Sequence, residues 1–484
     1  MSNGTTSHSG TVGSEGGVVA TPSRILPIIV VPGIGGTRLK DPVTHELVWN
    51  PMGSPMGNSP GAMAFDTDRM AEIDSPLEPV EFRPSLARVE RAELVASTGR
   101  GLRQAESLRL RYDVLHYSNL IPDFYGNLVR RLHAELPAML EPYDYRPMIF
   151  CCGYDFRQDN ATSAARLGRV AAEAALASHD QPPILIVHSM GGHVARHYLR
   201  VLHGEARALF LCATPSIGAP EPYLYLKRGM TVTPVSSVDA ALGAVGLGSR
   251  SAAARAQDSL MDAITRWFMT GGLSEESSRS FYRNMPGIFQ LMPNAIYGRH
   301  VPHFLQFDER LTGIPASGPT RRGATFDDCS DVRRLYTDVF TGLIDVPADR
   351  QKCTTNIELA MAFHEALIEG GRMWIPPNTY IVHGGGLETI SGASITGEAV
   401  VSERGQNYVR IGSAEDHHVR TGDNSVPAVS ACPPADLLST PLAREPTPAM
   451  AAAAHRDFPN DDRVVRYMLG EIANLVAMGS LSGR

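Results

Sequence analysis

The sequence contains little cysteine and no long hydrophobic run, and both absences narrow the possibilities. Its six cysteines in 484 residues are too few for a disulfide scaffold, and none form the CxxC pairs of zinc sites. A reducing compartment is therefore expected. No apolar run approaches the length of a membrane span, and the N-terminus lacks the basic segment and apolar core of a secretory signal. If Met1 is the true start, these features predict a cytoplasmic protein.

The sequence also lacks a block of positive charge. It carries 44 basic and 51 acidic residues, a net charge of −7, so it offers no electrostatic footprint for phosphate backbones. A nucleic-acid partner is not expected. Hydrophobic residues at 43% and charged residues at 20% are ordinary for a globular protein with a sizeable core. The length fits either several domains or one large core with insertions.

Four short apolar runs organise the chain, and each ends at glycine or proline or just before one. These runs span residues 24–31, 183–187, 208–213 and 380–383. Helix-like segments separate them, which predicts an α/β fold: a mostly parallel sheet with helices on both faces. Residues 1–22 are rich in Gly, Ser and Thr and are expected to form a flexible tail before a single domain at 23–484.

Two long stretches, at about 41–115 and 221–371, break this rhythm and are interpreted as insertions. They leave from the carboxyl ends of the predicted strands, where α/β proteins hold their functional loops, so they could form a cap over a site. An apolar cluster in the second stretch fits a lid surface for lipid and ordinary core equally well. Its members are Ile264, Trp267, Phe268 and Met269.

The sharpest local signal is the segment Val187-His188-Ser189-Met190-Gly191, a strand, a tight turn and a helix. In such a nucleophile elbow the small residues expose the serine hydroxyl at the edge of the sheet. Ser189 is therefore the predicted nucleophile. The alternative is that Ser189 merely caps the helix that follows.

A serine nucleophile needs an imidazole base and a carboxylate that orients it, in the chain order Ser, acid, His. Asp423 lies in a turn with Gly422 and Asn424 and is the predicted acid, with Asp416 as competitor and a purely structural turn as alternative. His455 is the single histidine after it and is the predicted base, unless it is a plain surface residue.

The backbone amides of Met190 and Ile34 are the predicted oxyanion donors, one after the nucleophile and one in the glycine-rich loop after the first strand. That loop could instead bind phosphate, but it lacks the Lys-Ser/Thr pair of a P-loop. His193 and His197 have the spacing of metal ligands without a third ligand, and Cys151-Cys152 is expected to be buried and inert. No cofactor or metal is predicted.

With these residues identified, the chain resembles the lecithin:cholesterol acyltransferase family, which includes lysosomal phospholipase A and related bacterial lipases. The matching segments are residues 31–39 with Trp49, 124–128, 153–157, 188–191, 213–218 and 422–427, with His455 matching by position. The resemblance implies an α/β-hydrolase core, a Ser-His-Asp triad, and a cap and lid that opens towards lipid, with transient contact at a membrane surface.

The sequence thus predicts a serine esterase or acyltransferase acting on a lipid or similar hydrophobic ester through an acyl-enzyme. One alternative is an esterase, thioesterase or amidase for a soluble substrate. Another is a binding protein that retains the fold without catalysis. The acyl chain, the acceptor and the oligomeric state depend on pocket shape and are left open.

Overall fold

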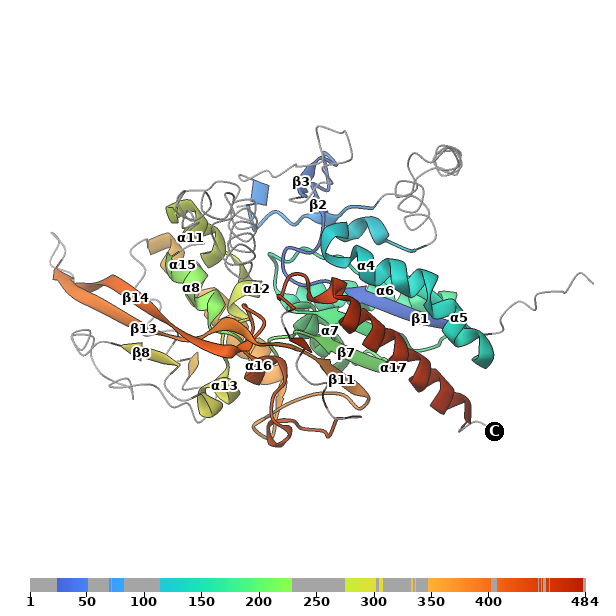
Figure 1. Cartoon of the computed structure of the whole chain (residues 1–484). Coiled ribbons are helices and arrows are strands. Elements are labelled where there is room, and N and C mark those ends of the chain that lie inside the picture. The colour runs from blue at the N-terminus through green and yellow to red at the C-terminus, as the bar shows by residue number, and fades with distance from the viewer. Residues whose placement is uncertain are drawn as a thin grey trace, which may run out of the picture.

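The computed structural model in Figure 1 describes most of the chain apart from the N-terminal tail and parts of both predicted insertions. The described residues are 24–50, 69, 70, 72–81, 114–228, 275–301, 304–307, 332, 333, 336, 347–401, 407–442, 444, 446, 450, 451 and 453–481. The predicted tail and the apolar cluster at 264–269 lie outside them.

A five-stranded parallel sheet forms the centre of the molecule (Figure 1). Its order is β11-β7-β6-β1-β5, and the strands are β1 (Arg24–Val31), β5 (Tyr145–Cys151), β6 (Ile184–His188), β7 (Ala208–Cys212) and β11 (Thr379–Val382). Every residue of β6, β7 and β11 is buried, as continuous apolar strands covered on both faces should be. The predicted α/β fold class is confirmed.

Strand β5 was not among the predicted strands because Arg146 and Pro147 interrupt its apolar pattern. Its position at the end of the strand order explains this composition. A strand there has a neighbour on one side, so a proline that donates no hydrogen bond is tolerated.

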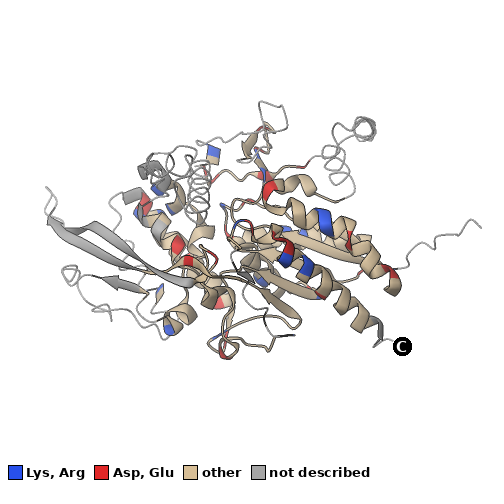
Figure 2. Cartoon of the chain, in the orientation of Figure 1, with Lys and Arg blue, Asp and Glu red and all other residues tan. Residues whose placement is uncertain are grey.

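Helices cover both faces of the sheet. Helices α6 (Asn160–Ala177) and α7 (Gly191–Arg200) pack together on one face, and α4 (Pro122–Ala134), α5 (Leu136–Leu140) and α17 (Asp462–Leu481) pack together on the other (Figure 1). Among the described residues, no helix combines the length and apolarity needed to cross a bilayer. Figure 2 shows basic and acidic residues interspersed along these helices.

The remaining helices and long strands lie to the left of the sheet in Figure 1. The helices are α8 (Glu221–Arg228), α11 (Glu275–Arg283), α12 (Pro286–Phe289), α13 (Ala295–His300) and α15 (Pro347–Ala366). A long antiparallel hairpin, β13 (Leu387–Val401) and β14 (Asn407–Gly422), extends away from the sheet with β8 (Leu305–Phe307) parallel to β13.

Several short elements complete the described chain. They are β2 (Leu39–Lys40), β3 (Leu47–Trp49), β4 (Glu78–Pro79), β9 (Ile368–Glu369), β10 (Arg372–Met373), β12 (Gly384–Gly385), β15 (Met450–Ala451), α16 (Ala428–Ala431), and the 3-10 helices η2 (Tyr117–Asn119), η3 (Glu141–Tyr143), η7 (Ala435–Leu437) and η8 (Phe458–Asn460).

A buried ion pair ties the first predicted insertion to the core. Arg157 is fully buried and binds Asp155, with 2.7 Å between Nη2 and Oδ2. The same guanidinium donates to four backbone carbonyls in the segment 69–75, and Asp155 accepts the N–H of Leu77. Because an unpaired buried arginine would be very costly, these carbonyls fix the segment beside the sheet.

Candidate active site

Ser189 occupies a strained turn directly after β6. Its φ of 52° lies in the left-handed region, which side-chain-bearing residues adopt rarely, and its N–H donates to the Cys212 carbonyl at 3.0 Å. A Cβ atom on Gly33 would lie 2.8 Å from the Ser189 Cβ, and one on Gly191 would lie 2.6 Å from the Pro32 carbonyl oxygen. The glycines are therefore what allows the loop after β1 to approach the serine.

Ser189 does not cap the helix that follows. Helix α7 begins at Gly191, its N-cap position is Met190, and no side chain caps it. The Ser189 hydroxyl instead contacts the imidazole of His455, with 2.8 Å between Oγ and Nε2.

His455 bridges Ser189 and Asp423. Its Nδ1 lies 2.8 Å from Asp423 Oδ2, and because a carboxylate can only accept, Nδ1–H is the donor and Nε2 is left to accept the serine proton. The structure thus brings together His455 with Asp423, 32 positions away in the sequence, and with Ser189, 266 positions away. Asp416, the alternative acid, lies instead within β14, where it pairs with Ala393.

Asp423 also has the structural role that was considered as an alternative. Its Oδ1 accepts the N–H groups of Ser425 at 3.2 Å and Val426 at 2.7 Å, and its side chain is fully buried. One carboxylate oxygen therefore builds the turn while the other binds the imidazole. The turn role and the contact with His455 are thus compatible, because they use different oxygens of the same carboxylate.

The electrostatic surroundings of His455 favour its protonated form. Burial lowers the pKa of the imidazole, but the charge and hydrogen bond of Asp423, with a contribution from Glu221, outweigh burial and leave the pKa above its ordinary value. Such a base readily takes a proton from a hydroxyl group.

A second histidine, His188, connects the turn that carries Ser189 to the loop that carries His455. Its Nε2 lies 3.0 Å from the backbone oxygen of His455, and its Nδ1 lies 2.9 Å from Tyr125 Oη. The carbonyl can only accept, so Nε2 carries the proton; burial holds the His188 pKa well below its ordinary value, so Nδ1 is free to accept from the phenol. Tyr125 Oη in turn accepts the N–H of Gly33 at 2.8 Å.

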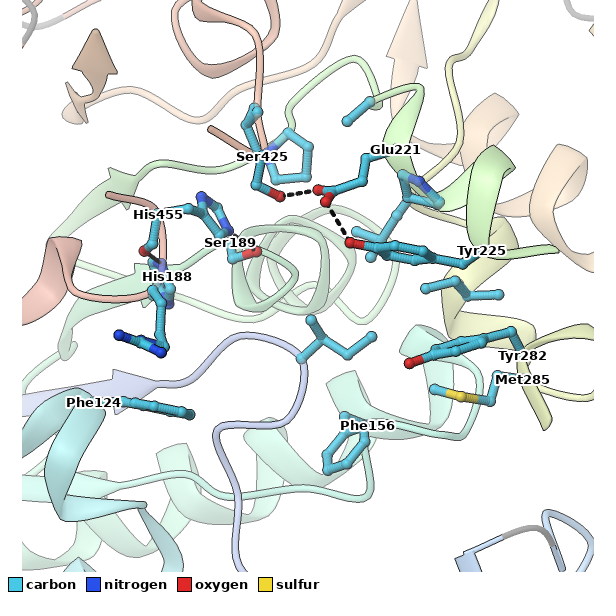
Figure 3. Close-up of a pocket in the computed structure, with 18 of the residues that line it drawn as sticks. Phe124, Phe156, His188, Ser189, Glu221, Tyr225, Tyr282, Met285, Ser425 and His455 are labelled. Carbon is cyan, nitrogen blue, oxygen red and sulfur yellow. Dashed lines mark hydrogen bonds between the residues drawn. The ribbon is translucent and has the colours of Figure 1, made fainter. Parts of the chain in front are cut away.

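An apolar cavity of ≈ 190 Å³ opens beside these residues (Figure 3). Apolar residues that precede and that follow Ser189 in the sequence line it. They include Ile34, Trp49, Met70, Phe124, Phe156, Phe281, Met285, Ile288 and Leu291. Ile34, whose backbone amide is one of the predicted oxyanion donors, is among these lining residues. Met190 is fully buried directly after Ser189 and is not among the described lining residues.

Glu221 is an unpredicted member of the cavity lining. It begins α8, and its carboxylate accepts hydrogen bonds from the hydroxyl groups of Ser425 and Tyr225 (Figure 3). Sequence offered little signal for it, since Glu221 and Ser425 are 204 residues apart.

The other sequence candidates remain outside this site. His193 and His197 pack against the ring of Phe363, and no group of three or more potential metal ligands occurs among the described residues. Cys151 and Cys152 are buried, and burial raises the pKa of the Cys152 thiol to about 12. A thiol so rarely ionised is a poor nucleophile.

The model of the lecithin:cholesterol acyltransferase family matches residues 128–240, a segment that includes Ser189. The resemblance seen in the sequence is therefore confirmed, and an acyl hydrolase or acyltransferase class of activity is supported. A chain in the crystal structure of the Tle4-Tli4 complex is 17% identical, with a TM-score of 0.55, over 94% of this chain and 99% of that one. Together with the parallel sheet, these matches confirm the α/β-hydrolase fold. No curated protein sequence matches the chain.

Proposed function

We propose that this protein is a serine-dependent hydrolase or acyltransferase for lipid or similarly hydrophobic esters. The observation that carries the proposal is the chain of 2.8 Å contacts from Ser189 Oγ to His455 Nε2 and from His455 Nδ1 to Asp423 Oδ2, at the wall of an apolar cavity. Nucleophile, base and orienting carboxylate in this order are the parts that acyl transfer requires.

In the first half of the reaction, Ser189 Oγ attacks the ester carbonyl carbon while His455 Nε2 takes the hydroxyl proton. Asp423 holds the imidazole in the required tautomer and stabilises the imidazolium that forms. Collapse of the tetrahedral intermediate breaks the ester C–O bond, and His455 returns the proton to the departing alcohol. The acyl group is left on Ser189.

The negative oxygen of the tetrahedral intermediate needs hydrogen-bond donors. We assign this role to the backbone amides of Ile34 and Met190, since Ile34 lines the cavity next to Gly33 and Met190 directly follows the nucleophile. Gly33 itself is engaged, because its N–H donates to Tyr125.

In the second half, water or an alcohol attacks the acyl-serine with His455 again as the base. Water gives hydrolysis and an alcohol gives transfer. The choice depends on how well the cavity holds an acceptor alcohol while excluding water, so the segments of the two insertions that line it are proposed to act as a cap that sets the outcome.

Product analysis tests the proposal. The wild-type protein and Ser189→Ala are incubated with phosphatidylcholine vesicles that contain a sterol and a long-chain alcohol, and products are identified by mass spectrometry. New esters that require Ser189 indicate transfer, and free fatty acid alone indicates hydrolysis. Soluble esters are supplied to both proteins in a parallel reaction. If Ser189-dependent products form only from the soluble esters, the lipid substrate class in the proposal is wrong. If neither the vesicles nor the soluble esters give a Ser189-dependent product, the proposal is overturned.

A further inference from the structure

Asn460 connects the loop that carries His455 to the first turns of α4. Its Nδ2 donates to the Asp123 carbonyl at 2.7 Å, and its Oδ1 accepts the N–H groups of Asn127 at 3.0 Å and Leu128 at 3.4 Å. In a regular α-helix the N–H of Asn127 donates to the carbonyl of Asp123, four residues earlier. The side-chain amide of Asn460 therefore binds both partners of one helical hydrogen bond, as a peptide group would.

These partners fix the orientation of the Asn460 amide. A backbone carbonyl can only accept and a backbone N–H can only donate, so the amino group of Asn460 faces Asp123 and its oxygen faces Asn127. The Asn127 side chain answers from α4, since its Nδ2 donates to the Asn460 carbonyl at 2.8 Å and to Asp462 Oδ1 at 3.1 Å. Both the side chain and the main chain of Asn460 are thus bound to α4.

Two successive turns connect Asn460 to the loop of the proposed base. The Asn460 N–H donates to the Asp457 carbonyl at 2.9 Å, and the Asp457 N–H donates to the Ala454 carbonyl at 3.0 Å. Phe458, between them, is fully buried. Because each turn is closed by a backbone hydrogen bond, a displacement of Asn460 also displaces His455.

The first turns of α4 also contact the other parts of the site. Phe124 lines the cavity, and the hydroxyl of Tyr125 binds the N–H of Gly33 and the ring of His188 (Figure 3). The helix is thereby fixed to the cavity wall and to the turn that carries the nucleophile. Through Asn460 the same helix also holds the loop that carries His455.

We propose that Asn460 is a positioning residue for acyl transfer, which keeps His455 Nε2 within hydrogen-bonding distance of Ser189 Oγ by binding the histidine loop to α4. His455 moves a proton in every chemical step of the proposed reaction, and small displacements of such a group slow those steps strongly. Asn460 is not among the described residues that line the cavity, so its removal should affect ester binding little. The inference rests on the proposed function, since it concerns the base of the same site.

Steady-state kinetics with p-nitrophenyl octanoate test the positioning role. In Asn460→Ala, kcat should fall by about tenfold or more while KM stays within about threefold of the wild type. If this variant does not fold, Asn127→Ala, which removes the bonds donated from α4, should lower kcat by about threefold or more at the same KM.

Ser178→Ala is the matched control for these variants. Its Oγ donates to the Ala174 carbonyl at 2.8 Å at the end of α6, so the change also removes a side-chain bond to a helix carbonyl. The control should keep kcat and KM within about twofold of the wild type. A kcat in Asn460→Ala equal to that of the wild type would overturn the inference, as would an equal loss of kcat in Ser178→Ala.

Hydrogen exchange without substrate separates this inference from the proposed function. In the described structure the N–H groups of His455, Asp457, Asn460 and Asp461 all donate to backbone carbonyls. Asn460→Ala should speed amide exchange in a peptide covering residues 453–461 by about tenfold or more and leave exchange in α6 within about twofold, as measured by mass spectrometry. Unchanged exchange at 453–461 contradicts the inference whatever the activity. Faster exchange there, in a protein without Ser189-dependent activity, would contradict the proposed function alone.

Discussion

The Tyr125 hydroxyl donates to Nδ1 of His188 at 2.9 Å and thereby fixes the tautomer of the residue that precedes the proposed nucleophile. The same oxygen accepts the N–H of Gly33, and the opposite ring nitrogen of His188 donates to the backbone of His455. One phenol therefore links the loop proposed to hold the oxyanion to the loop that carries the base.

Removing that phenol should impair catalysis more than binding. In Tyr125→Phe the buried Gly33 N–H and His188 Nδ1 lose their partner, so unfolding free energy should fall by about 1–3 kcal/mol. Because the loops shift slightly, kcat should fall by about tenfold or more with KM little changed. Tyr143→Phe, on η3 at the far end of β5, serves as the control and should change neither. Steady-state kinetics and denaturant unfolding check both values; a pure KM effect would contradict the positioning role.

The acid limb of the pH profile should reflect His455. The base works only when its imidazole is neutral, and its folded pKa lies above the ordinary 6.5. As pH falls through that raised pKa, kcat/KM should decline, with a midpoint above 6.5. Glu221→Gln removes one negative charge that favours the imidazolium, so its midpoint should move to lower pH. A midpoint that stays fixed, measured on a neutral ester, contradicts this electrostatic account.

Gly33 should tolerate no side chain. The Cβ of Gly33→Ala would lie 2.8 Å from the Ser189 Cβ and 3.2 Å from His188 Nδ1, so the serine loop must move. We expect a loss of activity of about a hundredfold. Gly126→Ala is the matched control, since its Cβ would meet nothing nearer than 3.5 Å and it lies within α4. That control should keep full activity and gain about 0.5–1 kcal/mol of stability.

The free energy of unfolding should decline at mildly acid pH, in part because His364 is buried. Burial lowers the pKa of His364 to about 4. Below about pH 6.5 the His364 imidazole binds a proton in the unfolded chain but stays neutral in the folded chain. The free energy of unfolding therefore falls between about pH 6.5 and 4, and this residue contributes about 3 kcal/mol to the fall. His364→Gln, which can still donate to the Gln290 carbonyl, should make this dependence less steep in unfolding titrations. An equally steep decline in the variant would assign it to other groups.

The three residues that meet at the candidate site could be proposed from sequence. Ser189 is indicated by a strand, a turn and two glycines that follow it. Asp423 and His455 were then chosen from the chain order Ser, acid, His. The apolar runs of β1, β6, β7 and β11 were predictable within two residues at either end, since full burial requires them.

The contacts that the sequence did not indicate join segments that lie far apart in the chain. Tyr125 reaches His188 from 63 residues away, and Glu221 reaches Ser425 from 204. Nothing in the local pattern of either residue distinguishes it from an ordinary core tyrosine or surface glutamate. The β13–β14 hairpin was also missed, because its strands lie outside the central sheet and their sequences lack the continuous apolar run that marked the others.

The most direct test of the central claim is to trap the acyl-enzyme. The protein is mixed with a slowly deacylated hydrophobic ester, quenched in acid within milliseconds to seconds, digested, and its peptides are weighed by mass spectrometry. The account predicts an added acyl mass on the peptide that contains Ser189, absent in Ser189→Ala and strongly reduced in His455→Gln. Turnover of the ester with no acyl mass on Ser189, or an equal adduct in Ser189→Ala, would contradict it.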